Sequence, residues 1–508
     1  MRFLVGLVFA LLLAVPGFAQ DKAESEILAP YSVSKEMSLR VGGRMVNFTA
    51  TAGETYLRAE DGTPRASIFS VSYIEEGVSD PTARPVVFVF NGGPGSASLW
   101  LHMGAFGPKH VITPGDATDV GAPPYTVENN PNSLLDVADL VFIDPVGTGY
   151  SRALGETEAK EFYGVDEDAE SIAEFIRVWI TRNGRWNSPK FLAGESYGTT
   201  RAAAVTQELQ GGWSGIAVNG VVLISAIMDF QGARFAPGND TAHIAFFPTM
   251  AMTAWYHDKV DHARWGNDLE AFAADARSFA THILPPALIR GSTLSKAERN
   301  DLADQMSEYL GVSPDWILDS NLRVNPTQFR KELLRDEDLT VGRFDSRYTG
   351  VDSNSVGDTP ENDPSGYGMD AAYTAAINDY LTRELGVNFR EGGREDGEPL
   401  DRLYKVLTGE PGSQWNWSEG GRGWPAYVNV TPRLGQAMRE NDDLRVLLAS
   451  GWYDLATPFF GAETSLYKNG IVLDRVDFTY YEAGHMMYLV SDEAKNLSED
   501  VRNFIRGE

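Results

Sequence analysis

The sequence contains no cysteine in its 508 residues. Without cysteine the chain can form no disulfide, has no thiol nucleophile, and can bind no metal through thiolates. Exported eukaryotic proteins often depend on disulfides. If this chain is exported, its composition is therefore more typical of a bacterial periplasmic or secreted protein.

Basic residues are also few. The 43 lysines and arginines stand against 71 aspartates and glutamates, which gives a formal charge of −28 at pH 7. A surface this acidic repels phosphate backbones. We therefore expect no nucleic acid partner.

Long apolar runs are absent after the first residues. Arg2 is followed by an apolar run from Phe3 to Val15 and then by the small-x-small sequence Gly17-Phe-Ala19. This order predicts a signal peptide over residues 1–19. The alternative, a membrane anchor, fits less well because a spanning helix needs about 20 apolar residues. We expect cleavage, export to the periplasm or the medium, and no membrane association afterwards.

Buried strands and helices alternate through much of the remaining chain. Residues 20–84 hold short alternating segments with turns such as Gly42-Gly43, which predict antiparallel hairpins leading into the core. Apolar runs then predict core strands at 85–90, 139–143, the stretch before Gly194, 220–225, 444–450 and 476–481. An amphipathic pattern predicts a crossover helix over 166–182, so the sheet should be mostly parallel.

This alternation of strands and helices is interrupted between residues 229 and 430. That stretch has helical patches, such as 296–310, separated by glycine, proline, aspartate and aromatic residues. It predicts a cap inserted between a first core segment, 85–228, and a second, 431–508. The expected class is α/β, with a mixed, mostly parallel central sheet and a large cap insertion.

A nucleophile elbow is predicted around Ser196. A predicted strand leads into an alanine-rich helix through the sequence Gly194-Glu-Ser-Tyr-Gly198. The serine therefore has a glycine two residues away on each side. A serine on such a turn adopts strained backbone angles, and larger flanking side chains would collide. In this fold an acid and a histidine follow the serine in order, each after a core strand. Asp454 and His485 satisfy this order, and the other six histidines precede Asp454.

The glycine-rich loop Asn91-Gly-Gly-Pro-Gly-Ser-Ala-Ser98 follows the strand at 85–90. It could be a tight turn, a phosphate-binding loop or an oxyanion hole. The phosphate reading lacks the usual Gly-Lys-Ser/Thr ending. The oxyanion reading assigns the two N–H donors to Gly93 and to Tyr197, the residue after the nucleophile.

Three other patterns have weaker functional readings. Gly147-Thr-Gly149 is half of a dinucleotide fingerprint without its third glycine, so we expect no cofactor. Asp352-Ser-Asn354 resembles a calcium loop, but Val356 occupies a ligand position, so we expect a solvated loop and no metal. The aromatic stretch from Gln414-Trp-Asn-Trp417 to Gly423-Trp424 could be a small core or the lining of a substrate cleft.

Five motifs together resemble those of the serine carboxypeptidase family, peptidases of α/β-hydrolase fold that trim C-terminal residues. They are, in order, Asn91-Gly-Gly-Pro-Gly95, Asp144-Pro-Val-Gly-Thr-Gly-Tyr-Ser151, Gly194-Glu-Ser-Tyr-Gly198, Asp454 and Gly484-His-Met486. The resemblance implies Ser196 as nucleophile, His485 as general base and acid, and Asp454 as its orienting partner. It also implies that Asn91, Gly92 and Glu195 bind the carboxylate of a peptide substrate with a free C-terminus.

This carboxylate site requires a protonated Glu195, since an ionised glutamate would repel the substrate. Family members usually add a second glutamate shortly before a Gly-Pro pair, and here Ala105 stands at that position. Arg152 or Arg201 could instead clamp the carboxylate. The expected function is a serine carboxypeptidase that acts through an acyl-enzyme. The alternatives are an esterase or acyltransferase with the same machinery, and a binding protein without activity.

Overall fold

The computed structural model describes residues 27, 29–211, 214–367, 369–388, 403–418 and 427–508. The predicted signal peptide, 1–19, and the Gly423-Trp424 pair lie outside these residues. None of the described helices is long and apolar enough to cross a membrane.

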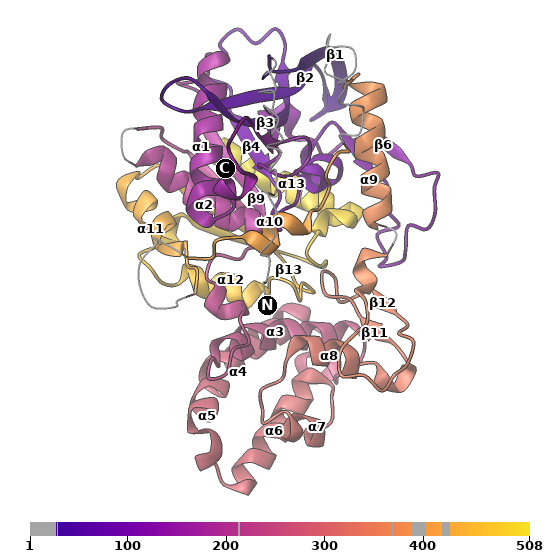
Figure 1. Ribbon diagram of the computed structural model, residues 1–508. Helices are drawn as coiled ribbons and strands as arrows, with labels where there is room; N and C mark the ends of the chain where they lie inside the picture. The colour runs from indigo at the N-terminus through magenta and orange to yellow at the C-terminus, as the bar shows by residue number, and fades with distance from the viewer. Residues whose placement is uncertain (1–26, 28, 212–213, 368, 389–402, 419–426) are drawn as a thin grey trace, which may run out of the picture.

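A ten-stranded sheet forms the centre of the molecule (Figure 1). Nine strands follow one another across it: β1 (Ser32–Val41), β2 (Arg44–Arg58), β3 (Pro64–Glu75), β7 (Asp139–Ile143), β4 (Val86–Phe90), β9 (Lys190–Glu195), β10 (Gly220–Ile224), β13 (Arg445–Gly451) and β14 (Val476–Tyr481). The tenth, β8 (Arg152–Ala153), pairs with β3. The six strands from β7 to β14 are parallel, and β1, β2 and β3 are antiparallel to their neighbours.

Both faces of the sheet are covered at its centre, where every residue of β4 and of β10 is buried. In β4, Val87 and Val89 point into one core, while Val86, Phe88 and Phe90 point into the other. The first core includes α9 (Met369–Asp379) and α13 (Ser491–Arg506). The second includes α1 (Val165–Arg182), α2 (Tyr197–Gln210), α11 (Thr431–Glu440) and α12 (Phe459–Leu466).

The chain between β10 and β13 leaves the sheet and builds a helical lobe with a third core (Figure 1, pink helices). Its helices are α3 (Thr241–Tyr256), α4 (Leu269–His282), α5 (Leu284–Arg290), α6 (Lys296–Leu310), α7 (Pro314–Asp319) and α8 (Pro326–Glu332). The chain then returns to the sheet through the two-stranded pair β11 (Thr340–Val341) and β12 (Thr349–Gly350), followed by α9 and α10 (Gly409–Gln414). A second small pair, β5 (Lys109–Val111) and β6 (Val127–Asn129), lies in the long β4–β7 connection.

The expected α/β class, with a mixed and mostly parallel sheet, is confirmed. All six predicted core strands are present, and those at 139–143 and 476–481 have the predicted limits. The Gly42-Gly43 turn joins β1 to β2, as the hairpin prediction required. The crossover helix predicted over 166–182 is α1, and the patch at 296–310 is α6.

Candidate active site

Ser196 lies between the end of β9 and the start of α2. Its backbone has φ 60° and ψ −130°, a strained conformation for a residue with a side chain. A Cβ on Gly194 would lie 2.1 Å from the Gly198 carbonyl oxygen, and one on Gly198 would lie 2.8 Å from the Phe90 carbonyl oxygen. The tight turn therefore requires both glycines. From Phe191 to Thr200, Ser196 is the one residue that is not classed as buried, so it is the accessible residue of the elbow.

His485 follows β14, and Asp454 follows the neighbouring strand, β13. His485 Nδ1 is 2.7 Å from Asp454 Oδ2. The other carboxylate oxygen accepts the backbone N–H groups of Ala456 and Thr457, at 2.8 and 2.9 Å. Asp454 is thereby fixed as an acceptor that orients the imidazole. Burial alone lowers the pKa of His485, but the Asp454 carboxylate reverses this, so the pKa lies above the usual histidine value.

A short segment of the insertion holds the His485 loop from outside. We call residues 344–347, between β11 and β12, the strap. The Phe344 carbonyl accepts the His485 N–H at 2.6 Å, and Asp345 accepts the Gly484 N–H at 3.2 Å. Arg347 pairs with Asp345 at 2.5 Å and donates to the Glu482 carbonyl at 2.9 Å. None of these contacts was predicted from the sequence.

The glycine loop after β4 lies directly against the elbow. A Cβ on Gly92 would lie 2.4 Å from the Tyr197 nitrogen, so only glycine allows this approach. Gly93 has φ +104°, which also favours glycine. Among the described residues, no hydrogen-bond acceptor is present for the N–H of Gly93 or of Tyr197. The structure thus brings together the loop and the residue from which the two oxyanion donors were predicted.

Glu195 and Asn91 are both buried beside the elbow. Burial raises the pKa of Glu195 to about 7; His485, Tyr488 and Asn91 act in the opposite direction, and Asp454 reinforces the rise. Asn91 Oδ1 accepts the Leu101 N–H at 3.1 Å, which fixes the amide. Within the described chain, the Asn91 Nδ2 group has no partner at hydrogen-bonding geometry, although it is close enough to lower the pKa of Glu195. The site thus contains a carboxyl that protonates readily and an unused amide donor.

The two arginines considered as carboxylate clamps have other roles, so that hypothesis was wrong. Arg201 is buried, pairs with Asp168 at 2.7 Å and donates to the Asn91 carbonyl, which holds the glycine loop against α2. Arg152 pairs with Glu54 at 2.5 Å. Ala105 is buried in a π-helical turn, Leu101–Phe106.

The described part of the aromatic stretch lies beside the elbow, and one of its two tryptophans belongs to the core. The rings of Trp415 and Trp417 lie 5.2 and 6.0 Å from that of Tyr197, each nearly perpendicular to it. Trp415 is 8% exposed and belongs to the core, whereas Trp417 is 41% exposed. One ring therefore packs behind the elbow and the other faces solvent beside it.

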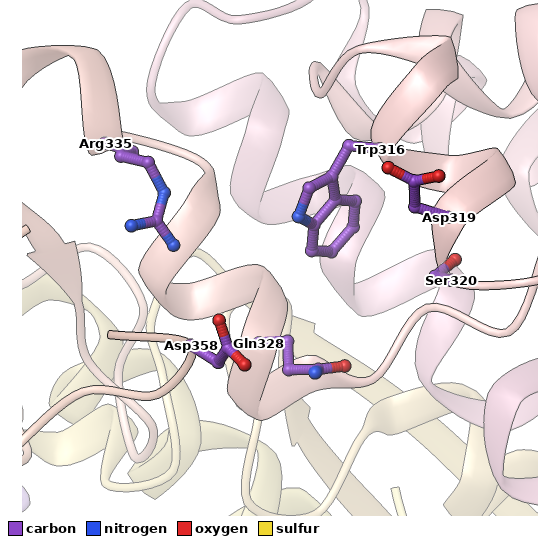
Figure 2. Close-up of a pocket in the computed structure, with 6 residues that line it drawn as sticks. All are labelled: Trp316, Asp319, Ser320, Gln328, Arg335 and Asp358. Carbon is purple, nitrogen blue, oxygen red and sulfur yellow. The ribbon is translucent and has the colours of Figure 1, made fainter. Parts of the chain in front are cut away.

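The helical lobe has a separate surface pocket of about 150 Å³ (Figure 2). It is lined by Trp316, Asp319, Ser320, Gln328, Arg335 and Asp358. The Arg335 guanidinium is already bound to Glu332 and to the carbonyls of Ser355 and Gly357, so none of the described lining residues offers a free cation. In the nearby 352–358 loop, Asp352 pairs with Lys331 at 2.5 Å. The described residues contain no cluster of three or more potential metal ligands.

Comparison with known proteins agrees with this geometry. The family profile described as serine carboxypeptidase matches residues 45–332. Serine carboxypeptidase-like 29 of Arabidopsis thaliana is 30% identical over 128 residues, which are 25% of this chain and 25% of that protein. Serine carboxypeptidase ctsa-3.1 of Caenorhabditis elegans is 27% identical over 215 residues, 41% of this chain and 34% of that protein. The matched segments thus span only about a quarter to a third of these relatives.

A solved structure extends the likeness to the whole fold. Kex1(delta)p, a prohormone-processing carboxypeptidase from Saccharomyces cerevisiae, superposes with a TM-score of 0.54 over 91% of each chain at 14% identity. This likeness shows a shared α/β-hydrolase fold. Since the family profile also covers more than half of the sequence, the chain belongs to the serine carboxypeptidase family.

Proposed function

We propose that the protein is a serine carboxypeptidase that releases C-terminal amino acids from peptides through an acyl-enzyme. The observation that carries this proposal is the buried pair beside the nucleophile. Glu195, whose pKa is raised to about 7, and the unused Asn91 amide together offer two donors to a carboxylate. An esterase acting on neutral substrates has no need of such a pair.

The first half of the reaction forms an ester on Ser196. His485 Nε2 accepts the hydroxyl proton while Ser196 Oγ attacks the carbonyl carbon of the last peptide bond. The N–H groups of Gly93 and Tyr197 stabilise the resulting oxyanion. His485 then gives its proton to the leaving nitrogen, the C–N bond breaks, and the C-terminal amino acid departs.

The second half hydrolyses that ester. A water molecule gives a proton to His485 and attacks the acyl carbon. The bond to Ser196 Oγ breaks, and Oγ recovers the proton from His485. The shortened peptide leaves with a new C-terminal carboxylate. Throughout, Asp454 keeps Nε2 directed toward the reacting atoms by holding Nδ1.

The decisive experiment compares three substrates: a blocked peptide with a free C-terminus, its amide, and a blocked amino acid ester. We expect the free-terminus peptide to have a kcat/KM well above that of the amide. Replacing Ser196 by alanine should lower kcat by about four to six orders of magnitude. Rapid ester turnover without peptide trimming would show an esterase or acyltransferase instead. Failure of a fluorophosphonate to label Ser196 would show a protein without this chemistry.

A further inference from the structure

Tyr488 contacts Glu195 from the loop that carries His485. Its hydroxyl donates a hydrogen bond to Glu195 Oε2 at 2.8 Å. Both side chains are buried, Tyr488 at 5% and Glu195 at 3% exposure. The two residues are 293 positions apart in the sequence, and the contact exists because the ends of β9 and β14 lie at the same edge of the sheet.

The Tyr488 ring has little freedom to move. A Cβ on Gly104 would lie 2.5 Å from Tyr488 Cε2 and 2.7 Å from the hydroxyl oxygen of Tyr373. Tyr373, on α9, packs in turn on Trp100, with ring centroids 4.8 Å apart. The π-helical turn that contains Ala105 and the insertion helix α9 therefore enclose the ring and fix where its hydroxyl points.

A tyrosine hydroxyl fixed in this way decides which oxygen of Glu195 carries the acid proton. A protonated carboxyl has one hydroxyl oxygen and one carbonyl oxygen, and only the latter accepts a hydrogen bond well. A protonated Glu195 that accepts the Tyr488 hydrogen bond through Oε2 carries its proton on Oε1. We propose that Tyr488 is a positioning residue that holds Glu195 so that Oε1–H faces the terminal carboxylate of the substrate, in place of a second acidic side chain. This inference rests on the proposed carboxypeptidase function.

The pKa of Glu195 is raised by other causes than the pKa of a carboxyl that lies beside a second carboxyl. Two neighbouring carboxyls raise the pKa of one of them by like-charge repulsion. Here burial makes the largest contribution to the raised pKa, Asp454 adds to it, and His485, Tyr488 and Asn91 lower it. Tyr373 also lies close to Glu195, and its pKa is raised first by burial and then by the charge of Glu195. Tyr488 thus orients the carboxyl while slightly favouring its ionised form.

The test replaces Tyr488 by phenylalanine, which preserves the ring and removes one oxygen. For a peptide with a free C-terminus, KM should rise about tenfold, and the basic limb of kcat/KM should move up by about one pH unit because a donor to the ionised form is lost. For an amino acid ester, which has no terminal carboxylate, kcat/KM should stay within about twofold.

A matched control is Tyr309→Phe. Tyr309 is also 5% exposed and also donates to a carboxylate at 2.8 Å, that of Asp275 in the helical lobe. Tyr309→Phe should leave unchanged the ratio of kcat/KM for the peptide to kcat/KM for the ester. It should also leave unchanged the high-pH limb of kcat/KM for the peptide. A second test introduces Tyr488→Phe into the Glu195→Gln variant and compares the KM of the two for a peptide with a free C-terminus. The amide needs the same orientation but cannot ionise, so KM should still rise about tenfold.

The results separate this inference from the proposed function. If the unaltered enzyme prefers the free C-terminus and Tyr488→Phe keeps both that preference and the basic limb, Tyr488 is only structural. If the unaltered enzyme has no preference for a free C-terminus, the proposed function itself is wrong and this inference falls with it.

Discussion

Glu195 ends β9 and His485 lies on the loop after β14, and each shifts the pKa of the other. In the proposed mechanism the active form has a protonated Glu195 and a neutral His485. The form with ionised Glu195 and charged His485 holds the same number of protons but can neither bind the carboxylate nor accept the serine proton. Because the two groups interact, the limbs of a pH profile belong to the pair rather than to single residues.

Glu195→Gln separates these two titrations. The rate should rise with pH as His485 loses its proton and fall as Glu195 ionises near pH 7, which gives a bell-shaped kcat/KM for free-terminus peptides. The amide stays neutral, so the fall above pH 7 should disappear. The rising limb should move to lower pH, because the Glu195 charge that raises the pKa of His485 is gone. A variant whose fall above neutrality is unchanged would show that Glu195 does not belong to the pair that titrates there.

At the scale of elements, the strap ties the insertion to the loop that carries His485. Asp345→Asn removes the charge that pairs with Arg347 and weakens the hold on Gly484. A displacement of about 1 Å at a catalytic group can lower the rate a hundredfold. We expect kcat on the ester, which needs no carboxylate binding, to fall about ten- to hundredfold.

Asp352→Asn is the matched control for the strap. Asp352 also forms a buried pair at 2.5 Å within the insertion, with Lys331, and no hydrogen bond in the described structure links it to the His485 loop. Asp352→Asn should lower the thermal midpoint of unfolding by about as much as Asp345→Asn does. It should leave kcat on the ester nearly unchanged. Equal losses of kcat in both variants would show that the strap stabilises the insertion without positioning His485.

The core elements could be predicted because their signals are local. Continuous apolar runs such as Val86–Phe90 occur in strands buried on both faces, and the loops after them carry the motifs. The helix Thr241–Tyr256 was not predicted. Its own apolar side chains lie on all of its sides and Pro248 lies inside it, so its sequence shows no amphipathic period.

Contacts between distant segments could not be read from the sequence either. Tyr488 and Glu195, or Gly484 and Asp345, are brought together only by the order of strands and the path of the insertion. The sequence did offer one usable signal. Ala105 stands where family members usually have a second glutamate, so another polar side chain could take its place beside Glu195. Tyr488, three residues after His485, has a polar group on the same loop as that histidine. That pattern could have directed attention to Tyr488.

For the molecule as a whole, folding should be favoured at mildly acidic pH. Burial raises the pKa of Asp144 from 3.8 to about 6 and that of Glu195 from 4.5 to about 7. The folded state then binds more protons than the unfolded state, so stability falls as pH rises through these ranges, by about 3 kcal/mol for each group. His485, whose pKa is also raised, acts in the same direction above pH 6.5.

The thermal midpoint should therefore be several degrees higher at pH 5 than at pH 8. Repulsion within a chain of formal charge −28 adds to the difference, and 0.5 M NaCl should remove that part while leaving the share of the buried groups. Asp144→Asn should narrow the gap further. A midpoint at pH 8 equal to that at pH 5 in low salt would refute this account.

The order of the parts along the chain has a consequence for biosynthesis. The nucleophile elbow belongs to the first core segment, while Asp454, His485 and Tyr488 follow the insertion and the strap. A polypeptide still emerging from the ribosome already contains the elbow sequence, but it lacks the proposed general base and the tyrosine that contacts Glu195. In the proposed mechanism, hydrolytic competence thus arises only when the last parallel strands, β13 and β14, join the sheet.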